Sequence, residues 1–290
     1  MRWDPGHQSD DVEDRRGEAP VRGGGGGLFG LFFLLARTPL GVGGALLVVG
    51  AIVAFGWIRG ALAPPDRASD HAPSRGGVTS QAEDREAAFV SFVLDDVQAT
   101  WEREFATLGK PYTRAKLVLF RDSTNTACGV GESATGPFYC PPDRRAYLDL
   151  SFFDELETRL HARGDFAKAY VIAHELGHHV QALLDVKAMN GGAAKKGADG
   201  SSVRLELQAD CYAGVWARST SKRDLLESGD LPSALTAAAA IGDDTLQKKG
   251  TGVVRPESFT HGTSAERQRW FKRGLENGVA GCDTFGATKL

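Results

Sequence analysis

The sequence predicts an α+β domain over residues 81–290, and the order of its elements is the main reason. Two strand-like runs, "AKLVLF" (115–120) and "AYLDL" (146–150), come early, whereas helical periodicity dominates from residue 166 onward. Such a separation of strands from helices is typical of α+β proteins. An uncharged run of 19 residues at 40–58 stands apart from this domain and predicts one transmembrane helix.

The chain before the domain divides into three parts. Residues 1–27 are polar, charged and glycine-rich, so we expect a disordered tail. Residues 28–59 form a membrane-anchor region whose main span is 40–58, and residues 60–80 read as a proline-rich linker. A buried core helix is a weaker interpretation of the main span, because its flanks offer nothing to bury it.

Arginine counts predict how this anchor is oriented. Five arginines precede the main span and three follow it, which favours a single-pass cell-membrane protein with a cytoplasmic N-terminus and an extracytoplasmic domain. A cleaved signal peptide is the alternative, because "ALA" at 61–63 resembles a cleavage site. Pro64 directly after it, and the long stretch before the apolar run, argue against cleavage.

The four cysteines suit an oxidising compartment. Cys128 and Cys140 could close a short loop, and Cys211 and Cys282 could tie a central helix to the C-terminus. Four cysteines allow three pairings, and the sequence does not choose between them. Free buried thiols would suit a cytosolic chain, so the expected disulfides depend on the predicted topology. The net charge of −3 and pI of 6.2 argue against a nucleic-acid partner.

Apolar periodicity and helix-stop signals give the helices of the domain. Within the last one, Thr263 or Ser264 is a candidate N-cap. The glycine-rich stretch 190–200 reads as a flexible loop, and the longer segment 187–201 is a candidate cover for a cleft. The predicted helices cover 81–108, 166–185, 202–219, 232–248 and 259–274.

The second of these helices carries "YVIAHELGHHVQ" (170–181), in which His174, Glu175 and His178 spell HExxH. Residues four apart share one helical face, so both imidazoles can reach the same metal ion. Glu175 is rotated by about 100° from His174 and can take a proton from a water that the metal activates. An ordinary polar helix face is the alternative, although two histidines and a glutamate are costly to bury without a role.

Two neighbours of this motif need an explanation. His179 lies off the common face of the two histidines and need not be a ligand. Gly177 costs about 1 kcal/mol relative to alanine inside a helix. We therefore expect another element to pack closely at Gly177.

A third metal ligand is expected within "RLELQADCYAGVWA" (204–217). Glu206 and Asp210 are four apart in an otherwise apolar helix, and no basic partner lies in the same turn. Glu206 as ligand, with Asp210 holding the second ring nitrogen of His174, would balance both charges. The alternatives are a solvated pair on an amphipathic helix and His261 as the third ligand.

These motifs together resemble a known family, the bacterial neutral zinc metallopeptidases, which are membrane-anchored relatives of the zincin proteases. The resemblance extends over nearly the whole chain and includes "MRW", "VEDRRG", "GPFYCPPD", "YLDLSFF", "HELGHHVQ", "LELQADCYAGVWA" and "FTHGTSAERQRWF". It implies a zincin-like fold, Zn²⁺ held by His174, His178 and Glu206, and Glu175 as catalytic base, with Asp210 in support.

The chemistry expected from these residues is hydrolysis of a peptide bond in a protein or peptide substrate. His261, in the polar stretch "THGTS", is a candidate oxyanion donor, and a helix-capping or packing role is its alternative. Substrates of zincins commonly bind along an edge strand, so "AYLDL" is a candidate, unless it is an interior strand.

Two rival functions stay open at this level. The domain could be a zinc-stabilised binding or assembly module on the membrane with little turnover, although Glu175 would then have no task. It could also be a zinc amidase that cleaves a non-peptide bond. The sequence predicts neither the substrate nor the oligomeric state.

Overall fold

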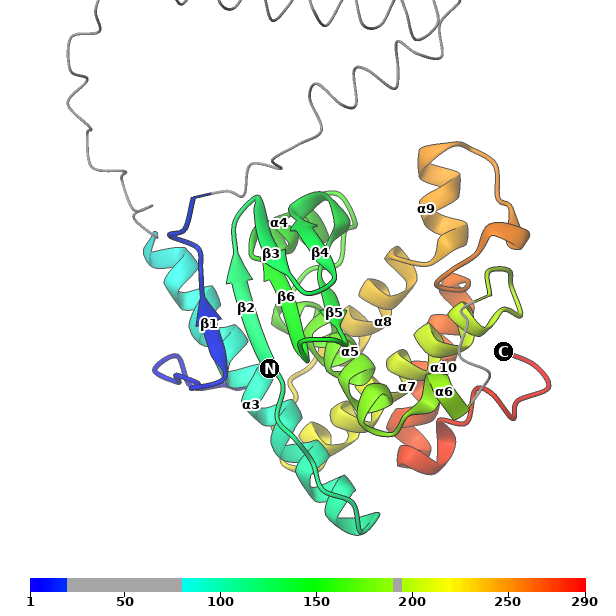
Figure 1. Ribbon diagram of the computed structural model, residues 1–290, viewed down its shortest axis with the longest axis horizontal. Coiled ribbons are helices and arrows are strands. Elements are labelled where there is room, and N and C mark those ends of the chain that lie inside the picture. Colours follow the sequence, from blue (N-terminus) through cyan, green and yellow to red (C-terminus); the bar gives the residue numbers. More distant parts are fainter. Residues whose placement is uncertain (20–79, 190–194) are drawn as a thin grey trace, which may run out of the picture. The chain divides into compact units, whose positions relative to one another are not determined.

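The structure is a computed structural model that describes residues 1–19, 80–189 and 195–290, and Figure 1 shows its helices and strands. The strands are β1 (Val12–Asp14), β2 (Lys116–Phe120), β3 (Ser123–Thr126), β4 (Gly129–Glu132), β5 (Phe138–Cys140) and β6 (Arg145–Asp149). The helices are α3 (Gln81–Thr107), α4 (Ser151–Thr158), α5 (Asp165–Leu183), α6 (Val186–Met189), α7 (Ser201–Lys222), α8 (Asp230–Ala240), α9 (Asp243–Gly250) and α10 (Ser264–Asn277). Short 3-10 turns lie at Ser133–Thr135, Pro256–Ser258 and Gly278–Gly281.

The main sheet has the strand order β1-β2-β6-β5 and confirms the α+β prediction. β1, β2 and β6 are parallel, and β5 runs antiparallel to β6. β3 and β4 form a separate hairpin. The run "AYLDL" belongs to β6, which pairs on both sides, so the interior-strand alternative holds for it, and the edges of this sheet are β1 and β5.

α5 is the central helix of the domain, and α3, α6, α7 and α8 contact it. α3 and α5 pack together beside the sheet, and α5 also contacts β5, β6, α7 and α8 (Figure 1). The apolar faces expected for α3, α5 and α7 are buried, with Trp101, Phe166 and Trp216 fully enclosed. The long predicted helices at 81–108, 166–185 and 202–219 are confirmed within three residues at each end.

Two of the later helices differ from their predicted bounds. The alanine-rich helix expected over 232–248 is two helices, α8 and α9, which are separated at Gly242. A Cβ on Gly242 would lie 2.5 Å from the backbone nitrogen of Ser264, so the chain turns where the two backbones approach. α10 begins at Ser264 rather than at 259, and its N-cap is Thr263, which forms a capping box with Glu266.

The expected disorder of residues 1–27 is wrong for residues 1–19, which fold onto the domain. β1 lies in this segment, and Trp3 Nε1 donates a hydrogen bond to Asp165 of α5 (3.1 Å). Residues 1–18 and the described residues from Ser80 onward belong to one compact unit. Among the described residues, no helix is long and apolar enough to cross a membrane, and the predicted anchor region 28–59 and most of the linker lie outside them.

The structure contains two disulfides, as expected, and they form one of the three pairings that the sequence left open. Cys128 is bonded to Cys140 and Cys211 to Cys282, and none of the four is free. The first bond joins the loop after β3 to edge strand β5, and the second joins α7 to the C-terminal segment. The predicted loop 190–200 falls partly on residues 190–194, which the structure does not describe.

The close packing expected at Gly177 is confirmed, and the packed element is α7. A Cβ on Gly177 would lie 3.0 Å from both the Cα and the carbonyl oxygen of Ala209. The backbones of α5 and α7 therefore approach at a position between the two histidines of HExxH. A side chain at this position would force the α7 backbone to move away by a few tenths of an ångström.

We expect Gly177→Ala to destabilise the domain by about 1–3 kcal/mol, because the added methyl group overpacks a backbone contact. Helix propensity alone would stabilise the alanine variant by about 1 kcal/mol. A net loss of stability therefore means that the steric cost of the added methyl group is larger than this gain. Thermal unfolding measures the effect as a fall in Tm of roughly 3–9 °C.

Gly250→Ala is the matched control for this substitution. Gly250 ends α9, and nothing lies within 4 Å of a Cβ placed there. This variant should be as stable as the wild type or slightly more stable. Equal Tm values for the two alanine variants would contradict the close approach of α5 and α7.

Candidate metal centre

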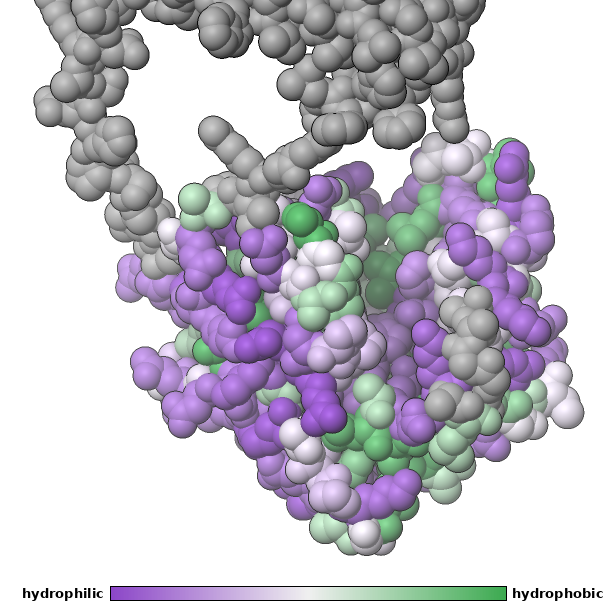
Figure 2. Space-filling model, viewed as in Figure 1, coloured by the Kyte–Doolittle hydropathy of each residue, from purple (hydrophilic) through white to green (hydrophobic). Residues whose placement is uncertain are grey.

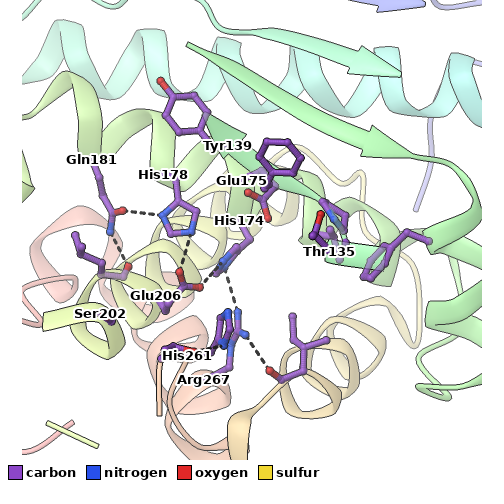
Figure 3. Close-up of a pocket in the computed structure, with 18 of the residues that line it drawn as sticks. Thr135, Tyr139, His174, Glu175, His178, Gln181, Ser202, Glu206, His261 and Arg267 are labelled. Carbon is purple, nitrogen blue, oxygen red and sulfur yellow. Dashed lines mark hydrogen bonds and ion pairs between the residues drawn. The ribbon is translucent and has the colours of Figure 1, made fainter. Parts of the chain in front are cut away.

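Three side chains from two helices converge on one point. His174 and His178 project from α5, and Glu206 projects from α7 across the contact at Gly177 (Figure 3). One ligand atom from each of the three residues lies within 4.8 Å of the other two. Glu206 Oε2 is 3.2 Å from His174 Nε2, and Glu206 Oε1 is 3.4 Å from His178 Nε2. The group could therefore hold a metal ion, as the sequence predicts.

The other nitrogen of each histidine has its own partner. His174 Nδ1 lies 2.9 Å from Asp210 Oδ1, and His178 Nδ1 lies 2.9 Å from Gln181 Oε1. Acceptors at Nδ1 place a proton there, so Nε2 is the nitrogen that a metal ion would take after displacing its proton. The donor set of two imidazoles and a carboxylate suits Zn²⁺.

Gln181 is a residue that the sequence analysis missed. Its Nε2 donates to the Leu205 carbonyl (2.7 Å) and to Gln208 Oε1 (3.1 Å), so the amide oxygen faces His178. Gln181 thereby joins the last turn of α5 to α7. The sequence contains one indication of this role, because Gln181 is a polar residue three positions after His178 in a mostly apolar helix.

Asp210 is completely buried, which excludes the solvated Glu–Asp pair. Its carboxylate contacts His174, accepts a hydrogen bond from Tyr170, and forms a two-pronged ion pair with Arg267 of α10 at 2.8 and 2.9 Å. The cation that the sequence argument required near Asp210 is therefore Arg267, 57 residues away in the chain. Arg267 is itself only 1% exposed, and the sequence analysis did not identify it.

The electrostatics of the centre favour a bound cation. Burial would raise the pKa of Glu206, but the facing imidazoles of His178 and His174 hold that pKa well below its ordinary value. Burial would likewise lower the pKa of His174, but the charge of Asp210 raises it to about 10. Two carboxylates thus draw positive charge to this point, and a metal ion would replace protons there. Metal affinity must then fall as the pH falls.

Glu175 lies beside the two histidine rings without being part of the three-donor group (Figure 3). Burial raises the pKa of its carboxyl group above the ordinary value, and the neighbouring His174 and His178 act in the opposite direction. A carboxylate with a raised pKa next to a metal position is suited to accept a proton and to release it again.

The centre opens into a cleft of about 1310 Å³. Figure 2 shows the surface hollowed between the part that carries the sheet and the part that carries α9. One wall includes Phe138 and Tyr139 of edge strand β5, and the opposite wall includes Leu246 of α9 and His261. A cleft bounded by a strand edge and of this volume can accommodate an extended peptide.

His261 lines the same cleft but is not a member of the three-donor group, so the structure does not support it as the third ligand. Asp243 at the start of α9 fixes the loop that carries it. Asp243 Oδ2 accepts the backbone N–H groups of Thr260, His261 and Gly262 at 2.6–3.0 Å, and its Oδ1 lies 3.1 Å from His261 Nδ1. Nε2 is therefore the ring nitrogen that can face a substrate.

His179 points away from the centre, as its position on the helix predicted. Its Nδ1 lies 2.9 Å from the hydroxyl of Tyr139, and its Nε2 lies 2.6 Å from the Thr113 carbonyl oxygen. Burial lowers the pKa of His179, so the neutral ring can donate to Thr113 and accept from Tyr139. The third histidine of the motif thus attaches edge strand β5 to the helix that carries the ligands.

Comparisons with known proteins agree with this geometry. Residues 1–285 match the model of the family described as "Putative neutral zinc metallopeptidase". The chain is 46% identical over 295 residues to the Escherichia coli (strain K12) protein "Uncharacterized protein YpfJ", with 99% of each chain covered. It is 47% identical over 210 residues to "Uncharacterized protein Rv2575" of Mycobacterium tuberculosis, covering 68% of this chain and 69% of that protein. No solved structure matches the chain.

We expect Arg267→Met to lower the free energy of unfolding by about 3–5 kcal/mol, because it leaves the buried Asp210 carboxylate without its strongest partner. Denaturant unfolding of the purified protein measures the loss. Arg269→Met is the matched control, since Arg269 is exposed on the same helix, and it should change stability by no more than about 0.5 kcal/mol.

A double variant separates the charge effect from lost packing. Asp210→Asn combined with Arg267→Met removes both charges and should recover part of the stability lost in Arg267→Met. If Arg267→Met were as stable as Arg269→Met, the buried ion pair would not be holding α7 to α10.

Proposed function

Because the chain belongs to the neutral zinc metallopeptidase family, we propose that it is an endopeptidase that hydrolyses peptide bonds at the centre formed by His174, His178 and Glu206. The observation that carries this proposal is Glu175, a half-buried carboxylate that stands beside a three-donor metal centre and lines the cleft. A site that only stabilises the fold has no need of such a group. The zincin-like fold is part of the same proposal and is supported by HExxH on a helix beside an edge strand.

The donor number supports a catalytic rather than a structural metal. Structural zinc sites are closed by four protein ligands, whereas catalytic ones keep one position open. Zn²⁺ in this centre would act as a Lewis acid that lowers the pKa of a water and polarises the substrate carbonyl. Three protein donors and an adjacent cleft leave room for the water and for the substrate carbonyl.

Glu175 is the proton carrier in this proposal. Its carboxylate accepts the proton of the attacking water and then delivers it to the leaving amine nitrogen. The pKa raised by burial suits both halves of this task, because a stronger acid would hold the proton too weakly to be an effective base. The imidazoles of His174 and His178 are kept in place by Asp210 and Gln181.

His261 is the proposed donor to the oxyanion that develops on the carbonyl oxygen. It lines the cleft, and Asp243 holds both its backbone and its Nδ1. A donor that is fixed before the substrate binds costs no reorganisation during the reaction. Asp243 is in this view a positioning residue and His261 the catalytic one.

The substrate is proposed to bind in an extended form along β5. This strand is short and is an edge of the sheet, and two of its three residues line the cleft. Backbone hydrogen bonds to an edge strand hold a peptide without reading its sequence. Side-chain preferences would then come from the walls of the cleft.

Glu175→Gln tests the proposal directly. Both the wild type and this variant should contain equal zinc, measured on the full chain by elemental analysis. Cleavage of an unfolded protein such as casein should fall by a factor of about 10²–10⁴, because the proton carrier is gone while the metal stays. Chelation should abolish the wild-type activity, and added zinc should restore it.

Glu206→Gln is the matched variant, because it removes a ligand rather than the base. It should lose zinc and activity together. Zinc in the wild type and in Glu175→Gln without cleavage by either would contradict a general endopeptidase, and would favour the binding or assembly module. Absence of zinc from the wild type would contradict the metal centre itself.

His261→Gln should lower kcat by roughly 10²-fold, because one oxyanion donor is lost. KM and zinc content should change little, since the ligands and strand β5 are untouched. Steady-state kinetics on a peptide cleaved by the wild type provides the measurement. A large rise in KM at constant kcat would instead assign His261 to substrate binding.

A further inference from the structure

The N-terminal segment is an integral part of the folded domain. β1 pairs in parallel with β2, with Val12 opposite Leu117 and Asp14 opposite Leu119. One further backbone hydrogen bond lies at each end of this pairing. Leu117 N–H donates to the Asp11 carbonyl, and Arg15 N–H donates to the Leu119 carbonyl, each at 2.8 Å. The domain sheet thus takes one of its four strands from residues that precede the apolar run.

Side chains attach the same segment to α3, to α5 and to the residues at the start of β2. Trp3 packs edge-on against Phe89 of α3 at 5.2 Å, besides its hydrogen bond to α5. Asp11 accepts hydrogen bonds from Gln98 and Lys116 at 3.1 and 2.8 Å and pairs with Arg114. These contacts are specific and largely charge-assisted, so they fix one position of the segment on the domain.

Both ends of the intervening chain leave the domain at the same place. Arg16, whose side chain is only 5% exposed, pairs with Asp14 at 2.6 Å and with Asp84 at 3.1 Å. Arg16 lies just before residues 20–79 and Asp84 lies just after them. One ion pair therefore joins the two flanks of the segment that contains the apolar runs.

A single complete membrane crossing between residues 20 and 79 would separate these flanks. The hydrocarbon core is about 30 Å thick, so a strand on one side could not pair with a strand on the other. We propose that residues 1–19 and 80–290 lie on the same side of the membrane. This proposal differs from the single-pass topology that the arginine counts favoured.

The same packing bears on the cleaved-signal alternative. Cleavage after Ala63 would release Trp3, β1 and Arg16 from the chain and leave β2 as an exposed edge. The two disulfides favour an oxidising compartment for the domain, and β1 must then be in that compartment too. The inference does not depend on peptidase activity.

Single-cysteine labelling of the membrane-bound full chain tests the topology. Glu18 and Lys248 are both exposed, one at the end of the N-terminal segment and the other on α9. Glu18→Cys and Lys248→Cys should both react with a membrane-impermeant maleimide in the same one of two preparations, spheroplasts or inverted vesicles, and neither should react in the other. Reaction of the two variants from opposite sides would overturn the proposal.

A cysteine pair tests the packing itself. Ser9 Oγ donates to Asp95 Oδ1 at 2.9 Å, so Ser9→Cys with Asp95→Cys should form a disulfide on mild oxidation of the membrane-bound chain. Glu18→Cys with Lys248→Cys is the control pair and should not crosslink, because β1 and α9 lie at opposite sides of the domain (Figure 1). Failure of the first pair to crosslink more than the control pair would also overturn the proposal.

Discussion

The buried carboxylate of Asp210 is the interaction on which the central helices depend. It lies on α7 and contacts His174 of α5 and Arg267 of α10, so one charge joins three helices that are distant in sequence. Isolated, such a carboxylate would be expensive to bury, and the guanidinium of Arg267 offsets that cost. The same contact sets the tautomer of a metal ligand, so stability and metal geometry are coupled at one residue.

Two contacts made by residues that are not metal ligands hold the ligand helix in place. Gly177 allows the backbones of α5 and α7 to approach, and this approach carries Glu206 to within 3.4 Å of both imidazoles. On the other side of α5, His179 holds Tyr139 of β5. The ligand helix is therefore fixed to α7 on one side and to the edge of the cleft on the other.

The features that were predicted correctly from the sequence are mostly patterns that span only a few residues. HExxH, the glycine within it and the Thr263 capping box act over four residues or fewer, and each is found where the sequence placed it. Arg267 and Asp243 were missed because their partners lie 57 and 18 residues away, and only the fold brings them together. Strand β5 was missed because its three residues show no alternation. The break at Gly242 was missed because alanine before it and leucine, glutamine and lysine after it all favour helix.

The N-terminal segment failed the disorder prediction for a reason that applies more widely. Low apolar content predicts disorder when a segment must build its own core. Residues 1–19 do not build one, because the domain offers them an open strand edge at β2 and an array of charged partners, including Arg114 and Arg145. A polar segment is ordered when the surface it meets satisfies its backbone and opposes its charges. The charged side chains that suggested a solvated tail form ion pairs with the domain, and these ion pairs hold the segment in place.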